Sequence, residues 1–291
     1  MRKQGIMKAL LVFLVFLVSS ALILYPFIAN YVFEHRSDSI VRAVEEEADE
    51  IDDSMRQSEL ERADRYNEMI ASGHIRLQDP FVEQDERSYS DNYESLLCMT
   101  EDGVMGFINI PSIHVSIPVY HGTAEQTLEA GAGHLEGSSL PIGGSGTHSV
   151  ITGHTGLSSA KMFTDLIELQ KGDVFILNIY GEKLIYEVDQ IKTVLPYELG
   201  DLAVSPGMDY CTLVTCTPYG VNTHRLLVRG VRTTETEVEE NEELFRAKAV
   251  ESRWMQEYKR DVLISFGLFA AGTAVLAVTR IVRRRKKNRR I

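Results

Sequence analysis

The sequence predicts a mainly β fold, a closed β-barrel with short helices, in the middle of a 291-residue chain. Residues 101–235 contain short apolar or alternating runs that Gly and Pro interrupt, such as GFINIPSIHVSIPVYHG and FILNIYGEKLIYEV. Helical patterns in this range are few and short, at Gln126–Ala130 and Ala160–Leu166. Many short strands with few helices are typical of a barrel, and Gly181 marks a hairpin in the second run.

An apolar run near each end of the chain is long enough to cross a membrane. Residues 9–28 follow several Lys and Arg residues, and residues 262–279 precede a basic tail, residues 280–291. A spanning helix needs roughly 17 to 25 apolar residues. Because Lys and Arg collect on the cytoplasmic side, we expect both termini inside the cell and the middle outside, with residues 1–33 as a first membrane anchor. A cleaved signal peptide is the alternative for the first run.

Three further segments connect the membrane runs to the barrel. Residues 34–73 carry apolar residues at helical spacing among many acids, which predicts one or two amphipathic helices. In residues 74–100 the helical spacing of apolar residues ends and the sequence is polar, which predicts a long exposed loop. One short island, Asp79–Phe81, interrupts this polar stretch. Loops of this length often act as lids or binding elements. The charged residues 236–261 predict a helix that leads into the second membrane run.

The charge of the outer part argues against nucleic acid as a partner. The formal net charge is −12, although eleven of the thirty Lys and Arg residues lie at the two ends of the chain. The middle is therefore strongly acidic, which disfavours binding to nucleic acid or to anionic lipid. We see no clustered ligand spacing for a metal and no motif for an organic cofactor, so we expect neither. The three cysteines are an odd number, which leaves at least one thiol free.

The stretch TLVTC, followed by the turn TPYGVN and the run HRLLVRG, predicts a hairpin that carries chemistry. Cys216 ends the first strand, and the second strand sets Arg225 beside it, within side-chain reach. Cys211 and Cys216 lie five residues apart and so point to opposite faces, which argues against a disulfide between them. A buried small hydrophobe for Cys216 and a surface ion pair for Arg225 are the simpler alternatives.

His154, in ITGHTGL, is the candidate third member of this group. It ends an apolar strand and stands between two glycines, a setting that exposes a side chain at the rim of a strand, although it also suits an ordinary turn residue. A thiol becomes a good nucleophile when a neighbouring imidazole or guanidinium favours its ionised form. Acyl transfer also needs a proton donor and a group that stabilises the oxyanion. Cys216, His154 and Arg225 could supply all three.

These motifs resemble the sortase family. TLVTC with the following Arg is similar to the family's cysteine signature, and ITGHTGL is similar to its histidine motif. GFINIPSI, VYHGT, GAGHLEGSSLPIGG and AKMFTDL extend the resemblance across most of residues 106–231. The resemblance implies a sortase-type barrel, with Cys216 as nucleophile, His154 as proton carrier and Arg225 as the oxyanion or substrate-positioning group. It assigns no role to Cys98, and we expect Cys211 in the core.

Within the family, CTPYGVNTHR, the second membrane run and the loop island are similar to class C, the pilin-polymerising sortases. The resemblance implies a lid formed by Asp79, Pro80 and Phe81, in which Asp79 pairs with Arg225 and Phe81 lies over Cys216. An ordinary turn is the alternative for this island. Thr155 departs from the pattern, because class C members often have Arg directly after the histidine.

The resemblance also implies the reaction and its partners. Cys216 would cleave an LPxTG-type sorting signal between Thr and Gly, and a lysine amine of another pilin subunit would accept the Thr carbonyl. Such an enzyme works at the outer face of the membrane in a Gram-positive-type envelope. Two other readings stay open: a sortase that anchors surface proteins to peptidoglycan, and a catalytically silent adhesin or scaffold.

Overall fold

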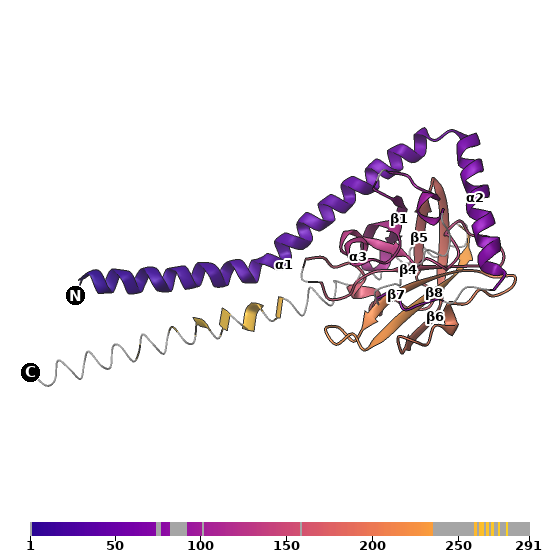
Figure 1. The fold of residues 1–291 in the computed structure, drawn as a ribbon. Coiled ribbons are helices and arrows are strands. Elements are labelled where there is room, and N and C mark those ends of the chain that lie inside the picture. Colours follow the sequence, from indigo (N-terminus) through magenta and orange to yellow (C-terminus); the bar gives the residue numbers. More distant parts are fainter. Residues whose placement is uncertain are drawn as a thin grey trace, which may run out of the picture. The chain divides into compact units, whose positions relative to one another are not determined.

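A computed structural model describes residues 2–73, 77–81, 92–100, 102–157 and 159–234, together with scattered helical positions between 259 and 278. Within residues 1–250, which form one compact unit, eight strands close into a barrel in the order β1-β2-β3-β4-β7-β8-β6-β5 (Figure 1). The strands are β1 (Val104–Ile110), β2 (Val115–His121), β3 (Ala132–His134), β4 (Thr147–Thr152), β5 (Val174–Ile179), β6 (Glu182–Val194), β7 (Asp209–Thr217) and β8 (His224–Thr233). The helices of this unit are α1 (Arg2–Glu50), α2 (Asp53–Ala71) and α3 (Glu125–Ala130), with 3₁₀ turns η1 (Tyr93–Ser95), η2 (Pro111–Ile113), η3 (Thr164–Glu168) and η4 (Gly200–Leu202).

The barrel combines hairpins with two parallel contacts. The predicted hairpin at Gly181 is confirmed: β5 and β6 are antiparallel, and Tyr180 and Gly181 both have positive φ, as a tight hairpin turn requires. Parallel pairing joins β2 to β3 and β4 to β7. The parallel β4–β7 contact places the carboxyl ends of these two strands at the same edge of the sheet.

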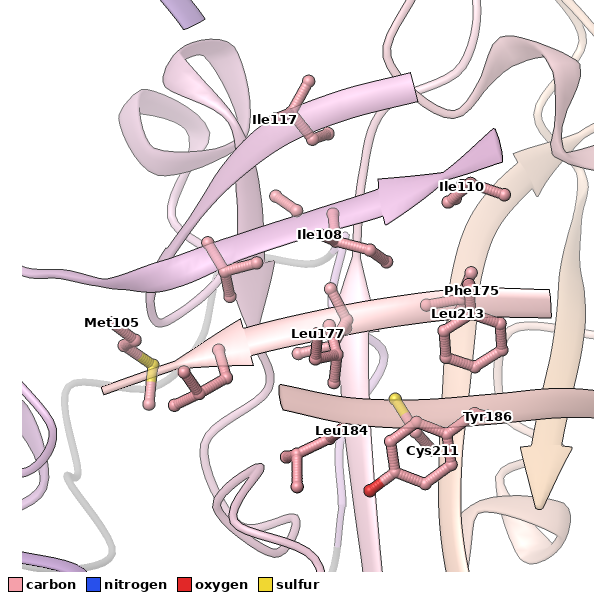
Figure 2. Close-up of a cluster of buried hydrophobic side chains, with 14 of the residues drawn as sticks. Met105, Ile108, Ile110, Ile117, Phe175, Leu177, Leu184, Tyr186, Cys211 and Leu213 are labelled. Atoms are coloured by element: carbon pink, nitrogen blue, oxygen red, sulfur yellow. The ribbon is translucent and has the colours of Figure 1, made fainter. Parts of the chain in front are cut away.

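Apolar side chains from the strands fill the inside of the barrel. Figure 2 shows this cluster, which includes Ile108, Leu177 and Leu213 from three different strands. Cys211 belongs to the same cluster and is fully buried, as the sequence predicts (Figure 2). Since strand residues alternate between two faces, Val214 and Cys216 point away from this interior.

The helical parts differ from the sequence prediction in two places. The region 34–73 holds two helices as expected, but the first is continuous with the N-terminal apolar run, so that α1 extends over Arg2–Glu50. The short helix near residue 126 is confirmed as α3. The helix expected over Ala160–Leu166 is instead the 3₁₀ turn η3, Thr164–Glu168. In this loop, Met162 adopts positive φ, a conformation that an α-helix cannot contain.

Residues 92–100 are not the exposed loop that their polar surroundings predict. Tyr93, Leu96 and Leu97 are buried in the barrel cluster, and Met99 packs against Val104. The reason is local composition: the apolar residues of SLLCM are enough to anchor this part of the segment. Cys98, between them, is exposed.

The part of the chain that the structure describes holds one helix long and apolar enough to cross a membrane, residues 12–50. The expected charged helix 236–261, the second membrane run 262–279 and the basic tail 280–291 lie outside the described residues, apart from the scattered positions between 259 and 278, which are helical.

Candidate active site

The hairpin of β7 and β8 brings the predicted thiol and guanidinium together. Cys216 and Arg225 are direct partners in the antiparallel register. Strand β7 continues one residue further than predicted, to Thr217, which does not change this pairing. Both residues are shielded from solvent, with 9% of Cys216 and 6% of Arg225 exposed.

A second apolar cluster covers the outer face of these strands. It contains residues from several elements, which we call the outer cluster: Leu135, Val150, Leu202, Val214 and Leu227, with Leu77, Phe81, Val194 and Leu199 against its edge. Val214 precedes Cys216 by two positions and Leu227 follows Arg225 by two, so the thiol and guanidinium lie on this same face. The site is therefore outside the barrel, at the rim of an apolar patch.

His154 lies two residues beyond the end of β4 and level with the end of β7. Thr152 pairs with Val214, Gly153 N–H donates to the Val214 carbonyl at 3.0 Å, and Thr215 Oγ donates to the Gly153 carbonyl at 2.7 Å. Two residues beyond these pairs come His154 and Cys216. A Cβ at Gly153 would lie 2.7 Å from the Phe163 ring, so only glycine fits before the histidine. The structure thus brings His154, Cys216 and Arg225 to one edge of the sheet.

The segment 77–81 lies on this group. Asp79 forms a two-pronged pair with Arg225, with Nε to Oδ1 at 2.8 Å and Nη2 to Oδ2 at 2.5 Å. Both side chains are 8% exposed. The Phe81 ring lies 5.8 Å from the His154 ring and 5.0 Å from the Arg225 guanidinium carbon. Pro80 between them is buried. The expected Asp79–Arg225 contact is present, and Phe81 contacts the imidazole and the guanidinium.

Burial keeps the thiol and the imidazole neutral in this arrangement. Burial raises the pKa of Cys216; the positive charge of Arg225 opposes this shift and the negative charge of Asp79 adds to it. Burial likewise lowers the pKa of His154, against the attraction of Glu125 and Glu129. Both shifts favour the uncharged forms of the two side chains, and a thiol is a weaker nucleophile than its thiolate.

Arg225 stays cationic despite its burial. Burial alone would lower its pKa, but the hydrogen bonds that Arg225 donates to Asp79, together with the charge of Asp79 and the charge that Cys216 carries when ionised, outweigh burial and raise it. Nη1 also donates to the carbonyls of Asn222 and His224, at 3.1 Å each. Backbone contacts therefore hold one edge of the guanidinium, and Asp79 occupies the other.

One contact near the site was not predicted. The loop after His154 is tied to α1, because the Lys161 N–H donates to the Asn30 side chain at 2.8 Å. The two residues are 131 positions apart, and no local pattern in the sequence links them. Among the described residues, no group of three or more His, Cys, Asp or Glu side chains is placed to hold a metal ion.

Comparisons with known proteins point to one family. The family model for the sortase domain matches residues 108–233. Sortase A of Bacillus anthracis is 29% identical over 127 residues, which are 44% of this chain and 59% of that protein. Sortase A of Streptococcus agalactiae is 30% identical over 117 residues, 39% of this chain and 47% of that protein. The chain thus spans about half the length of these curated relatives.

Solved structures are similar over more of their length. Sortase C1 of GBS Pilus Island 1 is 45% identical with a TM-score of 0.61, covering 68% of this chain and 92% of that one. Sortase C-1 from Actinomyces oris is 50% identical with a TM-score of 0.58, covering 62% and 99%. Sortase C of Streptococcus pneumoniae, described in relation to pilin substrate specificity, is 40% identical with a TM-score of 0.62, covering 67% and 97%.

Proposed function

The chain belongs to the sortase family, and we propose that it is a class C sortase, a cysteine transpeptidase that polymerises pilin subunits. The observation that carries the proposal is the direct pairing of Cys216 with Arg225, with His154 at the end of the adjoining strand. Similarity to sortases C of pilus systems at 40–50% identity supports the class.

Cys216 is the proposed nucleophile. It passes its proton to His154 and attacks the Thr carbonyl of an LPxTG-type sorting signal, and Arg225 stabilises the resulting oxyanion. The Thr–Gly carbon–nitrogen bond then breaks, and His154 returns the proton to the departing amine. A thioacyl enzyme remains on Cys216.

A lysine amine of a second pilin subunit completes the transfer. His154 takes a proton from this amine as it attacks the thioester, and Cys216 leaves as the thiolate, which regains that proton. The product is an isopeptide bond between subunits. Each proton and each bond is accounted for by these side chains and the two substrates, so the reaction as written needs no metal or organic cofactor.

We further propose that the segment 77–81 is a lid. Asp79 occupies Nε and Nη2 of Arg225, two donors that could otherwise face an oxyanion. Phe81 packs beside His154 and the guanidinium. A substrate carbonyl cannot receive those hydrogen bonds while the carboxylate holds them, so the segment has to leave before acylation.

The proposed topology completes the assignment. Residues 1–33 and 262–279 cross the membrane, the helices of 34–73, the lid loop 74–100 and the barrel 101–235 lie outside, and the charged residues 236–261 lead back to the membrane. The tail 280–291 is cytoplasmic. This arrangement holds the enzyme at a fixed height beside membrane-anchored pilin substrates and raises their effective concentration.

The test is adduct formation by the full chain with an LPxTG-bearing pilin and a lysine-bearing partner, followed by mass spectrometry. We expect a thioester on Cys216 and then an isopeptide-linked product, and Cys216→Ala should reduce cleavage by at least about a thousandfold. Cleavage by Cys216→Ala near the wild-type rate would refute the assignment. If only peptidoglycan-like amines release the acyl group from Cys216, the protein is an anchoring sortase. If no adduct forms, the catalytically silent adhesin or scaffold becomes the better interpretation.

A further inference from the structure

The middle of α1, just beyond its apolar run, contributes a buried polar residue to the loop that carries His154. Asn30 lies two residues beyond the apolar run 9–28 and is only 8% exposed. Its Oδ1 accepts a hydrogen bond from the Lys161 N–H at 2.8 Å, and its Nδ2 donates to Glu34 Oε1 at 2.9 Å. Both halves of the amide therefore have partners, and its orientation on the helix is fixed.

Lys161 is held by its side chain as well as by its backbone. Its Nζ donates to the Ile113 carbonyl at 2.6 Å and forms an ion pair with Asp165 at 2.9 Å. The side chains of this pair are 13% and 3% exposed. A buried ion pair in a loop is costly to disturb, since removal of one partner leaves the other charge buried and unpaired.

Lys161 is connected to His154 by hydrogen bonds and packing contacts within the same loop. Phe163 N–H donates to the His154 carbonyl at 3.0 Å, and the Phe163 ring packs on Gly153. Gly156 N–H donates to Thr164 Oγ1 at 3.1 Å. These bonds fold the described residues between 153 and 164 back on themselves, so that a shift at Lys161 displaces the backbone of His154.

We propose that Asn30 is a positioning residue for His154, which makes the middle of the N-terminal helix α1 a support of the active site. The inference rests on the proposed function, because it assigns Asn30 a role in the proton transfers of His154. Displacement of a reacting group by about 1 Å can reduce a rate by roughly a hundredfold, so a modest loosening of this loop is enough to affect turnover.

The experiment compares four forms of the full chain in lipid nanodiscs, all carrying Asp79→Ala so that the proposed lid does not limit the rate. Asn30→Ala removes the acceptor for Lys161. Asn30→Asp with Glu34→Gln keeps an oxygen toward Lys161 and reverses the second hydrogen bond while conserving charge. Glu34→Gln alone is the matched control. The fourth form is the Asp79→Ala parent. The readouts are kcat and KM for cleavage of an LPxTG peptide.

We expect Asn30→Ala to lower kcat about tenfold with KM within about twofold, because substrate binding is untouched while the proton carrier is displaced. The double variant should recover to within about threefold of the parent, and Glu34→Gln should equal it. A kcat for Asn30→Ala equal to that of the parent would overturn the proposal, as would an unrestored loss in the double variant.

Hydrogen exchange of the Lys161 amide gives a second reading if Asn30→Ala does not fold. Asn30→Ser shortens the side chain, and we expect about tenfold faster exchange at this amide in the folded protein. Unchanged protection would overturn the link between α1 and the loop. If the parent forms no thioacyl adduct at all, the proposed function is wrong, and the catalytic role of Asn30 is wrong as well. Hydrogen exchange of the Lys161 amide would still show whether Asn30 holds the loop in place.

Discussion

Two arginines on the same face of β8, four residues apart, make nearly identical contacts with different parts of the chain. Arg225 binds Asp79 through Nε and Nη2 at 2.8 and 2.5 Å, and Arg229 binds Asp189 through the same atoms at 3.0 and 2.6 Å. Each guanidinium also lies over an aromatic ring, that of Phe81 at 5.0 Å and that of Tyr210 at 4.1 Å.

The two arginines differ in which part of the chain supplies their partners. Asp189 and Tyr210 belong to β6 and β7, so Arg229 cannot lose them unless the barrel opens. Asp79 and Phe81 both come from the segment 77–81, which pairs with no strand. The same chemistry therefore joins two strands of the barrel at one position and joins a strand to a segment outside the sheet at the other. The second pair is the one that lies beside the thiol.

The largest expected difference between the two arginines is in the rate of substrate cleavage after each is replaced by lysine. In an Asp79→Ala background, Arg225→Lys should lower kcat/KM for an LPxTG peptide by about a hundredfold, because an ammonium cannot reproduce the planar fork toward an oxyanion. Arg229→Lys, in the same background, should remain within about threefold. Steady-state cleavage rates measure both. Near-normal activity of Arg225→Lys would mean that this residue supplies charge alone.

The second difference is in access to the thiol. Asp79→Ala should increase the labelling rate of Cys216 by a small thiol reagent about tenfold, since a loss of about 1.4 kcal/mol in the contact shifts the open fraction by that factor. Asp189→Ala should leave the rate unchanged, although it removes an equivalent ion pair. Labelling is followed by intact-protein mass spectrometry.

Cys98 needs separate treatment in this measurement, because it is exposed whereas Cys211 is buried. A Cys98→Ser background leaves Cys216 as the reactive thiol. Phe81→Ala should also increase the labelling rate of Cys216, because Phe81 belongs to the same segment as Asp79 and its ring packs beside His154 and Arg225. Equal labelling of the parent, Asp79→Ala and Phe81→Ala would remove the lid from the proposal.

The sequence predicts the parts of this picture that depend on local pattern. Strand alternation and a short turn were enough to place Arg225 beside Cys216, and an apolar run ending between glycines was enough to select His154. The island Asp79–Phe81 stood out within a polar loop, and its role as a lid was implied by the resemblance to class C. The barrel followed from short runs broken by turns.

The remaining features depend on tertiary contacts that no local pattern encodes. No local pattern distinguishes Arg225 from Arg229 by partner, because the choice lies in which distant aspartate reaches each strand position; the pairing of Asp79 with Arg225 was implied only by the resemblance to class C. The burial of Leu97 and the contact of Asn30 with Lys161 were likewise invisible. The helix expected around residues 160–166 was wrong because tertiary packing in this loop requires a positive φ at Met162 and allows only a 3₁₀ turn after it.

The smallest expected effect is a change in the pH dependence of Cys216 labelling, and we expect it for Asp79→Ala but not for Asp189→Ala. Burial and the charge of Asp79 raise the pKa of Cys216, and Arg225 opposes them. Asp79→Ala removes one raising charge, exposes the thiol and frees Arg225 to act on it. Because all three changes favour the thiolate, the pH profile of Cys216 labelling should move to lower pH. Asp189→Ala changes none of these neighbours, so its profile should overlay that of the parent. A faster rate without a shifted profile would mean that Asp79 limits access but does not govern ionisation of the thiol.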